Sequence, residues 1–163
     1  AALTGHLVFS TLHTNDAPGG VTRLLDMGIE PYLVAATVQG ILAQRLVRTV
    51  CPQCKQPHRP SADETRRVEA AGIGKGNRRF RTGSGCPLCT GTGYRGRGGV
   101  YELMMMSEAL RSAVVRGASL DELRREAQAQ GMVPLRHAAW AKAADGETTI
   151  AEAMRVASEE LSE

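Results

Sequence analysis

The sequence predicts an α/β protein that carries an inserted cysteine-containing module and ends in a series of short helices. Three observations predict this class: apolar runs typical of strands, two Cys-x-x-Cys pairs in a loop-rich middle, and helix-capping signals in the last third. With 163 residues, the chain can form one ordinary domain, or two small ones, around a real core.

Membrane-spanning and secretory segments are not predicted. No stretch reaches the roughly 18–20 uncharged residues that a membrane-spanning helix needs, and the first residues lack the basic region of a signal peptide. We therefore expect a soluble protein. The immediate start in strand-like residues, without an initiator methionine, predicts a fragment of a longer chain.

The first predicted element is a buried strand over residues 6–12, which are mostly apolar. His6 would begin this strand, and His13 would lie in the loop beyond its carboxyl end. Ligand chemistry in α/β sheets gathers at that end, so His13 with Thr11 and Thr14 is a candidate site. A core histidine without a chemical role is the alternative. Neither histidine has the spacing of a nucleophile triad or of an HExxH zinc site.

Two helices and a strand are predicted next. Residues 14–18 are typical of a turn and a helix start, and apolar residues continue at helical spacing until Gly28 and Pro31 end the helix. A second helix is predicted over residues 32–42. Residues 45–50 alternate between polar and apolar types, which predicts a strand that leads into the first cysteine.

The four cysteines give the strongest chemical signal in the chain. They form two Cys-x-x-Cys pairs separated by 31 residues: Cys51, Cys54, Cys86 and Cys89. Two such turns present four thiolates to one tetrahedral ion, so the pattern predicts a structural Zn²⁺ site. Disulfides would need a secretory context, and a thioredoxin-like pair would need only one of the two turns. Between the pairs, Ser61 would cap a helix over residues 62–71.

The positive charge is concentrated in the same region. Residues 51–97 hold ten Lys and Arg against three Asp and Glu, whereas the rest of the chain holds ten against fourteen. Such a module favours phosphates, an anionic membrane surface or an acidic partner, with a simple solvated surface as the alternative. Phe80 and Tyr94 do not make the stacking platform typical of single-stranded nucleic acid binding, so a nucleic acid partner is not expected.

The remaining elements are a strand and several helices. Residues 99–104 are strand-like, which places the basic module as an insertion at one edge of a sheet. Capping boxes begin helices at Ser119 and Thr149, each with a glutamate three residues later. Gly117, Gly131 and Gly146 occupy helix C-cap positions. We expect residues 104–106 and Trp140 to fill the core.

A phosphate-binding loop is not predicted. Residues 72–76 read Gly-Ile-Gly-Lys-Gly, with Gly where a Walker A motif needs Ser or Thr, and Glu69 stands where its first Gly should be. The chain therefore cannot cradle a nucleotide by itself.

Several segments taken together resemble the C-terminal portion of the bacterial secretion ATPases of the type II secretion and type IV pilus assembly class. The resemblance runs in order over essentially the whole chain. It is carried by residues 5–17, 44–48, 51–54, 86–97 and 99–102.

The resemblance implies a hexameric ATPase with a RecA-like domain. Residues 4–17 match the family's His box, which would place His6 and His13 close to the nucleotide and Arg45 near its pocket. The four cysteines match the family's zinc motif. ATP and Mg²⁺ would be bound mainly by parts upstream of Ala1, where Walker A and Walker B would lie, so the fragment alone should be inactive.

The resemblance also implies domains, partners and a location. Residues 1–50 would be the end of the RecA-like ATPase core, residues 51–97 the zinc module, and residues 98–163 a return strand and a C-terminal helical subdomain. The partners would be other copies in a homo-hexamer, an inner-membrane platform protein, and anionic lipid at the basic module. The protein would be cytoplasmic and peripheral to the inner membrane.

Two other interpretations remain open at this point. Residues 86–93 fit the CxxCxGxG signature of the zinc modules in J-domain co-chaperones, which would make the chain a non-enzymatic protein-interaction module. A nucleic-acid-binding zinc domain is the second. That co-chaperone signature occurs here only once, and neither interpretation explains residues 4–17.

Overall fold

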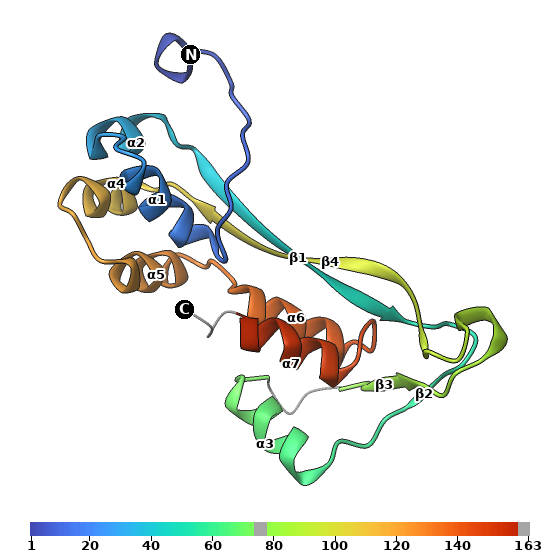
Figure 1. Ribbon diagram of the computed structural model, residues 1–163. Coiled ribbons are helices and arrows are strands. Elements are labelled where there is room, and N and C mark those ends of the chain that lie inside the picture. Colours follow the sequence, from blue (N-terminus) through green and yellow to red (C-terminus); the bar gives the residue numbers. More distant parts are fainter. Residues whose placement is uncertain (74–77, 160–163) are drawn as a thin grey trace. The chain divides into compact units, whose positions relative to one another are not determined.

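The computed structural model describes residues 1–73 and 78–159 and shows a mixed α/β protein, as predicted (Figure 1). The elements in chain order are η1 (Ala2–Thr4), α1 (Ala17–Asp26), α2 (Pro31–Thr37), β1 (Gly40–Val50), β2 (Lys55–Pro57), α3 (Ala62–Ala70), β3 (Arg81–Gly83), η2 (Pro87–Cys89), β4 (Tyr94–Met105), α4 (Glu108–Val115), α5 (Leu120–Ala129), α6 (Leu135–Ala144) and α7 (Ile150–Glu159). None of the described helices combines the length and the apolar character needed to cross a membrane.

The strands form two separate pairs. β1 pairs with β4, and the short strands β2 and β3 pair with each other in antiparallel register. Gly40 at the start of β1 lies against Met104 near the end of β4, and Gly98 lies near Thr49. The long pair is therefore antiparallel. The chain divides into two compact units, residues 1–43 with 102–134 and residues 44–101 with 135–163, and each long strand contributes to both units.

The first unit is built from α1, α2, α4 and α5. Asp16 caps α1 by accepting a hydrogen bond from the Gly19 N–H (2.8 Å), and its carboxylate also pairs with Arg124 of α5 (2.7 Å). The buried carboxylate of Glu102 accepts the Ala17 N–H (2.7 Å), which joins β4 to the start of α1. Apolar side chains fill the core between these elements: Val21, Val34, Leu110 and Leu123.

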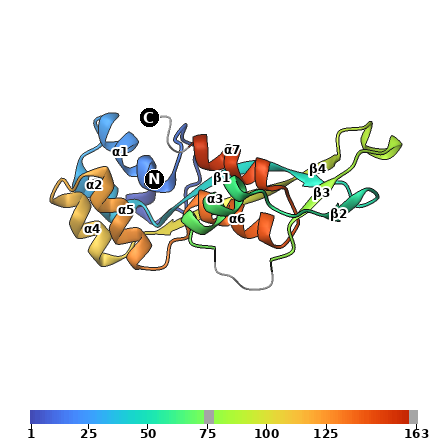
Figure 2. The same cartoon turned by 90° about the horizontal axis from the view of Figure 1, so that it is seen from below.

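The second unit is built around α6 and α7, which lie side by side (Figure 2). Trp140 of α6 and Ile150 of α7 are buried in its core, together with Val47 of β1. The Val50 N–H donates to the Glu147 carbonyl (3.0 Å), so the turn between the two helices is hydrogen-bonded to the end of β1. This contact brings the helix pair next to the first cysteine.

The predicted strand over residues 6–12 is wrong for the described chain. After the short helix η1, these residues adopt no regular secondary structure, and Leu7 and Phe9 are 77% and 88% exposed. A strand forms only where a neighbouring strand completes its hydrogen bonds, and apolar periodicity alone does not supply one. No described strand pairs with this segment.

The second predicted helix is also only half correct. α2 ends at Thr37, where Val38 turns to an extended backbone, and residues 40–42 belong to β1. Pairing with β4 overrides the helical pattern there, because tertiary context outweighs local propensity. The strands predicted over residues 45–50 and 99–104 are confirmed within the longer β1 and β4. Of the Gly-rich residues 72–76, positions 74–76 lie outside the described residues.

The predicted helix ends are largely confirmed. The Ser61 and Ser119 side chains cap α3 and α5 in full capping boxes, and Gly117, Gly131 and Gly146 have positive φ. Trp140, Met104 and Met106 are buried as predicted, although Met105 is exposed. At Thr149 only half of the box forms, because its hydroxyl accepts the Glu152 N–H while the Glu152 carboxylate reaches β1 instead.

Candidate metal centre

The four cysteine sulfurs converge in one cluster within the second unit. All four Sγ atoms lie within 4.8 Å of one another, and the cysteines are free thiols. The Sγ atoms of Cys51 and Cys86 are 3.8 Å apart, those of Cys54 and Cys89 also 3.8 Å, and those of Cys86 and Cys89 3.7 Å. Four sulfurs at the usual Zn–S distance of about 2.3 Å would lie roughly 3.8 Å from one another in a tetrahedron. The cluster therefore fits a zinc ion.

The strands place the two Cys-x-x-Cys turns face to face. Cys51 follows the end of β1, and Cys54 immediately precedes β2. The register of β2 with β3 pairs Lys55 with Gly83, and the Ser84 N–H donates to the Cys54 carbonyl (3.2 Å). The chain then enters η2, with Cys86 as its N-cap and Cys89 as its last residue, and these two cysteines form the second turn. Closing this short ribbon is what brings sulfurs 35 positions apart in the sequence into contact.

Close glycine packing holds the second turn in place. A Cβ atom on Gly83 would lie 2.1 Å from the Gly93 carbonyl oxygen, and one on Gly85 would lie 2.8 Å from that of Gly91. Gly93 also accepts the Cys51 N–H at its carbonyl (2.9 Å). Gly83, Gly85 and Gly93 are thus required by backbone contact, because a Cβ atom at any of them would lie under 3 Å from a backbone oxygen, whereas a Cβ atom on Gly91 would meet nothing within 4 Å.

Backbone N–H groups surround the sulfurs with positive dipoles. The N–H groups of Cys86 and Gly93 donate to Cys89 Sγ at 3.2 and 3.3 Å. Burial raises the pKa of the Cys89 thiol, but these donors and the neighbouring thiols outweigh it and lower the pKa to about 6. At Cys54, burial dominates and raises the pKa to about 11 despite an N–H donor from Gly85. Such donors stabilise the negative charge of metal-bound thiolates.

The other predicted site residues are not part of this cluster. His6 and His13 belong to the irregular N-terminal segment of the first unit and are exposed. The His6 ring contacts the Thr4 hydroxyl through Nδ1 (3.1 Å). Arg45 is half-buried on β1 in the second unit. Their predicted gathering around a nucleotide therefore stays a prediction.

Sequence reasoning missed an ionic network in the same unit that joins β1 to α7. The buried Glu152 carboxylate of α7 accepts hydrogen bonds from the backbone N–H (2.8 Å) and guanidinium (2.9 Å) of Arg48 on β1. The Arg48 guanidinium lies 4.1 Å above the Tyr94 ring, whose hydroxyl contacts Thr149 (2.8 Å). No local pattern predicts this network, because Arg48 and Glu152 are 104 positions apart.

Comparison with known proteins shows the family of the chain. A family model described as "Type II/IV secretion system protein" matches residues 1–155. The chain is 50% identical over 155 residues to the type IV pilus assembly ATPase PilB of Myxococcus xanthus, covering 93% of this chain and 27% of that protein.

Two type II secretion proteins are similarly close. Over 163 residues the chain is 45% identical to type II secretion system protein E of Pseudomonas aeruginosa, covering 98% of this chain and 31% of that protein. Over 159 residues it is 43% identical to type II secretion system ATPase E of Vibrio cholerae, again covering 98% and 31%. The chain thus spans less than a third of the length of these relatives. On these matches, the chain belongs to the type II/IV secretion system protein family.

Proposed function

We propose that this chain is the C-terminal part of a hexameric ATPase that couples ATP hydrolysis to assembly of a pilus or pseudopilus and to protein export. The observation that carries the proposal is the family match over residues 1–155, together with relatives named as pilus assembly and secretion ATPases. In this proposal, ATP and Mg²⁺ are bound mainly by residues outside the 163 of this chain. The chain alone has no Walker A motif and hydrolyses no ATP.

The histidine segment has a specific place in this proposal. Residues 1–50 complete a RecA-like ATPase core, in which His6 and His13 lie near the phosphates of the nucleotide and Arg45 lies at the edge of its pocket. The exposure of both histidines in the present structure supports this assignment, because they are free to meet residues of the complete protein. Residues 98–163 form the return strand and helical subdomain.

The cysteine cluster holds Zn²⁺ in a structural role. Four thiolates fill a tetrahedral zinc site and leave no open position for water or substrate, so the ion contributes folding energy and no Lewis-acid step. Cys51, Cys54, Cys86 and Cys89 are the ligands, and the N–H groups around Cys89 offset part of the negative charge that the thiolates bring.

The partners follow from the same family assignment. We assign the protein to the cytoplasmic side of the inner membrane, as a peripheral homo-hexamer that engages a membrane platform protein. The excess of positive charge in the zinc module supports an additional contact with anionic lipid. The low number of aromatic residues in that module gives no support to a nucleic acid partner.

Metal content and ATP hydrolysis, measured side by side, test the proposal. The two samples are the 163-residue chain and the complete protein that contains it. We expect one equivalent of zinc in both and ATP hydrolysis only in the complete protein. The variants H6A and H13A of the complete protein should keep their zinc and lower kcat by roughly tenfold or more, as expected for groups near transferring phosphates.

Two results would contradict parts of the proposal. A complete protein that binds zinc but hydrolyses no ATP would return the chain to the class of non-enzymatic zinc modules. Full activity in both histidine variants would remove His6 and His13 from the nucleotide site while leaving the ATPase assignment intact.

A further inference from the structure

A pocket of about 530 Å³ opens in the second unit, apart from the cysteine cluster. It lies between the start of α3 and the segments that lead into and out of the β2–β3 ribbon. Its lining consists of residues 57–60, Thr65 and residues 78–81. Four of these nine lining residues are arginines, and His58 adds a fifth nitrogen-bearing side chain.

Three of these arginines have no acidic partner among the described residues: Arg59, Arg79 and Arg81. Other arginines of the described chain do have acidic partners, as Arg67 has Asp63 (3.0 Å) and Arg124 has Asp16 (2.7 Å). The Glu64 carboxylate in the first turn of α3 already accepts the Ser61 N–H (2.8 Å) and contacts His58 Nε2 (3.1 Å). The pocket therefore carries uncompensated positive charge.

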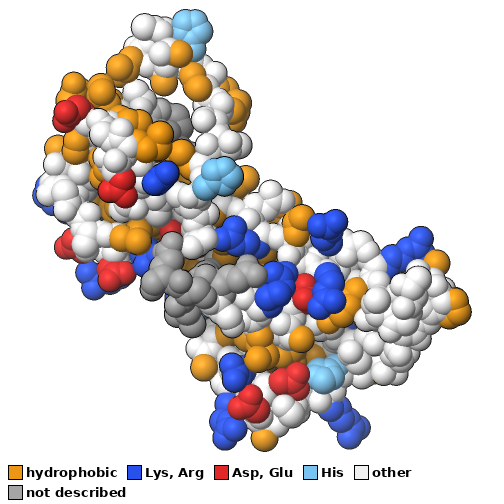
Figure 3. Space-filling model, in the orientation of Figure 1, with side chains coloured by type: hydrophobic (Ala, Val, Ile, Leu, Met, Phe, Trp, Pro, Cys, Tyr) orange, Lys and Arg blue, Asp and Glu red, His pale blue; other side chains and the backbone are white. Residues whose placement is uncertain are grey.

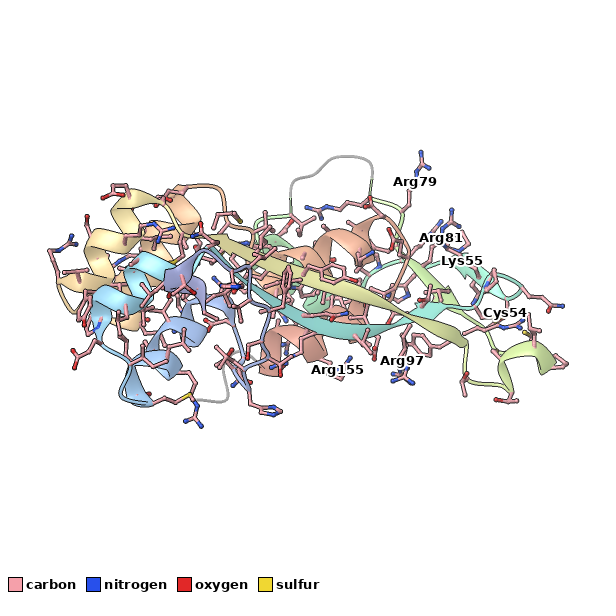
Figure 4. All side chains as sticks on the ribbon, turned by 90° about the horizontal axis from the view of Figure 1, so that it is seen from above. Cys54, Lys55, Arg79, Arg81, Arg97 and Arg155 are labelled. Carbon is pink, nitrogen blue, oxygen red and sulfur yellow. The ribbon has the colours of Figure 1, made fainter. Side chains whose placement is uncertain are left out.

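Backbone contacts fix the position of the segment that carries Arg79 and Arg81. The Arg79 N–H donates to the Ala144 carbonyl (2.6 Å), and Arg81 pairs with Pro57 across the ribbon. A Cβ atom on Gly146 would lie 2.5 Å from the Arg79 carbonyl oxygen, so the turn after α6 supports this segment directly. Phe80 between them is buried, and the Arg79 and Arg81 side chains point to the same side of the ribbon as Lys55 (Figure 4).

Hydrophobic surface adjoins these charges. Pro57 and Pro60 contribute apolar walls to the pocket, and in Figure 3 the region of α3 shows Lys and Arg side chains beside hydrophobic ones. Guanidinium groups present planar forks that match phosphate oxygens, and their charge strengthens each hydrogen bond. A phosphate group attached to a carbon skeleton combines the two properties that this pocket can recognise.

We propose that this pocket binds a phosphate group, with Arg79 and Arg81 as its principal ligands and Arg59 and His58 at its rim. The phosphate would belong either to an anionic lipid headgroup or to a soluble phosphate compound. The inference deepens the lipid contact of the proposed function by naming its site, and it does not depend on ATP hydrolysis by the complete protein.

Direct binding to the full 163-residue chain tests the pocket. One arm titrates inorganic phosphate and follows the arginine side-chain NMR signals, and the other measures co-sedimentation with phosphatidylglycerol vesicles against phosphatidylcholine vesicles. The test variant is R79Q/R81Q. The matched control is R66Q/R67Q, which removes the same charge from exposed arginines of α3 outside the pocket. Zinc content and melting temperature of both variants establish that they fold.

We expect saturable binding in at least one arm, weakened roughly 30-fold in R79Q/R81Q and less than about threefold in R66Q/R67Q, because each charge-assisted hydrogen bond contributes on the order of a several-fold to tenfold change in affinity. Binding of phosphatidylglycerol alone identifies a lipid headgroup, and binding of inorganic phosphate identifies a soluble source. Equal loss in the two double variants would overturn the pocket in favour of diffuse surface charge. Absence of saturable binding in both arms would overturn it as well.

Discussion

Glu152 is a buried carboxylate that ties helix α7 to strand β1. It is only 2% exposed and accepts hydrogen bonds from the Arg48 backbone and guanidinium, while Arg155 lies 3.3 Å away. Burial is the largest influence and raises the pKa of Glu152, but the two arginines outweigh it, so the pKa lies below its ordinary value. The ionised form is therefore the one that the fold stabilises.

Replacing this carboxylate should destabilise the second unit. We expect E152Q to lower the free energy of unfolding by about 2 kcal/mol, because breaking a buried ion pair leaves an uncompensated charge and the half-exposed Arg48 limits the cost. A carboxyl whose pKa is lowered by folding contributes stability above its unfolded pKa of about 4.3, and that contribution is lost as the pH falls through the folded pKa. The difference between wild type and E152Q should therefore shrink below about pH 4.

Urea unfolding at a series of pH values measures this difference. The control is E69Q on the exposed side of α3, which should match the wild type at every pH. A difference that stays constant down to pH 2 would mean that the Glu152 charge contributes nothing.

At the scale of elements, the metal centre depends on two glycine-bearing loops that pack backbone against backbone. The contact between Gly83 at the end of β3 and Gly93 before β4 leaves no room for a side chain. The same carbonyl of Gly93 accepts the Cys51 N–H, and the Gly93 N–H donates to Cys89 Sγ. One residue thus positions both Cys-x-x-Cys turns.

Two alanine substitutions separate this contact from ordinary backbone strain. Gly93 and Gly96 both have positive φ (77° and 79°), but a Cβ atom at Gly96 meets nothing within 4 Å, whereas at Gly93 it would lie 2.6 Å from the Gly83 oxygen. We expect G96A to cost about 1 kcal/mol through φ strain alone. G93A should cost several kcal/mol and weaken zinc affinity by roughly tenfold or more, since it displaces donors and ligands of the site.

Competition with a zinc chelator, together with thermal unfolding, provides both measurements. Equal effects of the two substitutions would show that the close approach of the loops does not matter to the metal site.

At the scale of the whole molecule, the N-terminal segment stands out because it exposes apolar side chains. Leu7, Val8 and Phe9 are 77%, 53% and 88% exposed, which is unusual for a contiguous apolar run. Under the proposed function, this segment is covered by the nucleotide-binding part of the complete protein. A charged substitution in this segment should therefore have little effect on the 163-residue chain and a large effect on the complete protein.

We expect F9D to change the stability of the 163-residue chain by less than about 0.5 kcal/mol, as is usual for an exposed position, and to lower ATP hydrolysis of the complete protein by roughly tenfold or more. Thermal unfolding and a phosphate-release assay measure the two effects. V133D is the matched control, because Val133 is a 54% exposed apolar residue in the loop between α5 and α6. Equal activity of F9D and wild type would contradict the proposed burial of this segment.

Much of this molecule could be predicted from local sequence signals. The Ser61 and Ser119 capping boxes, the glycine C-caps, the strand segments on both sides of the module and the two Cys-x-x-Cys turns are all short-range patterns. Such patterns succeed because the physical cause lies within a few residues: a side chain that satisfies a nearby N–H, a backbone that needs positive φ, or two thiols within one turn.

The tertiary structure decided the features whose partners are distant in the chain. Residues 6–12 have the composition of a strand but form none in the described chain, because a strand needs a neighbour. The Glu152 carboxylate binds Arg48 instead of completing the capping box at Thr149, and Gly93 packs against Gly83. Both contacts form only when the ribbon and the helix pair have folded. The sequence by itself determined the class of the protein and its two Cys-x-x-Cys turns, because these depend on neighbouring residues. Only the fold could bring together charges and backbones from distant segments.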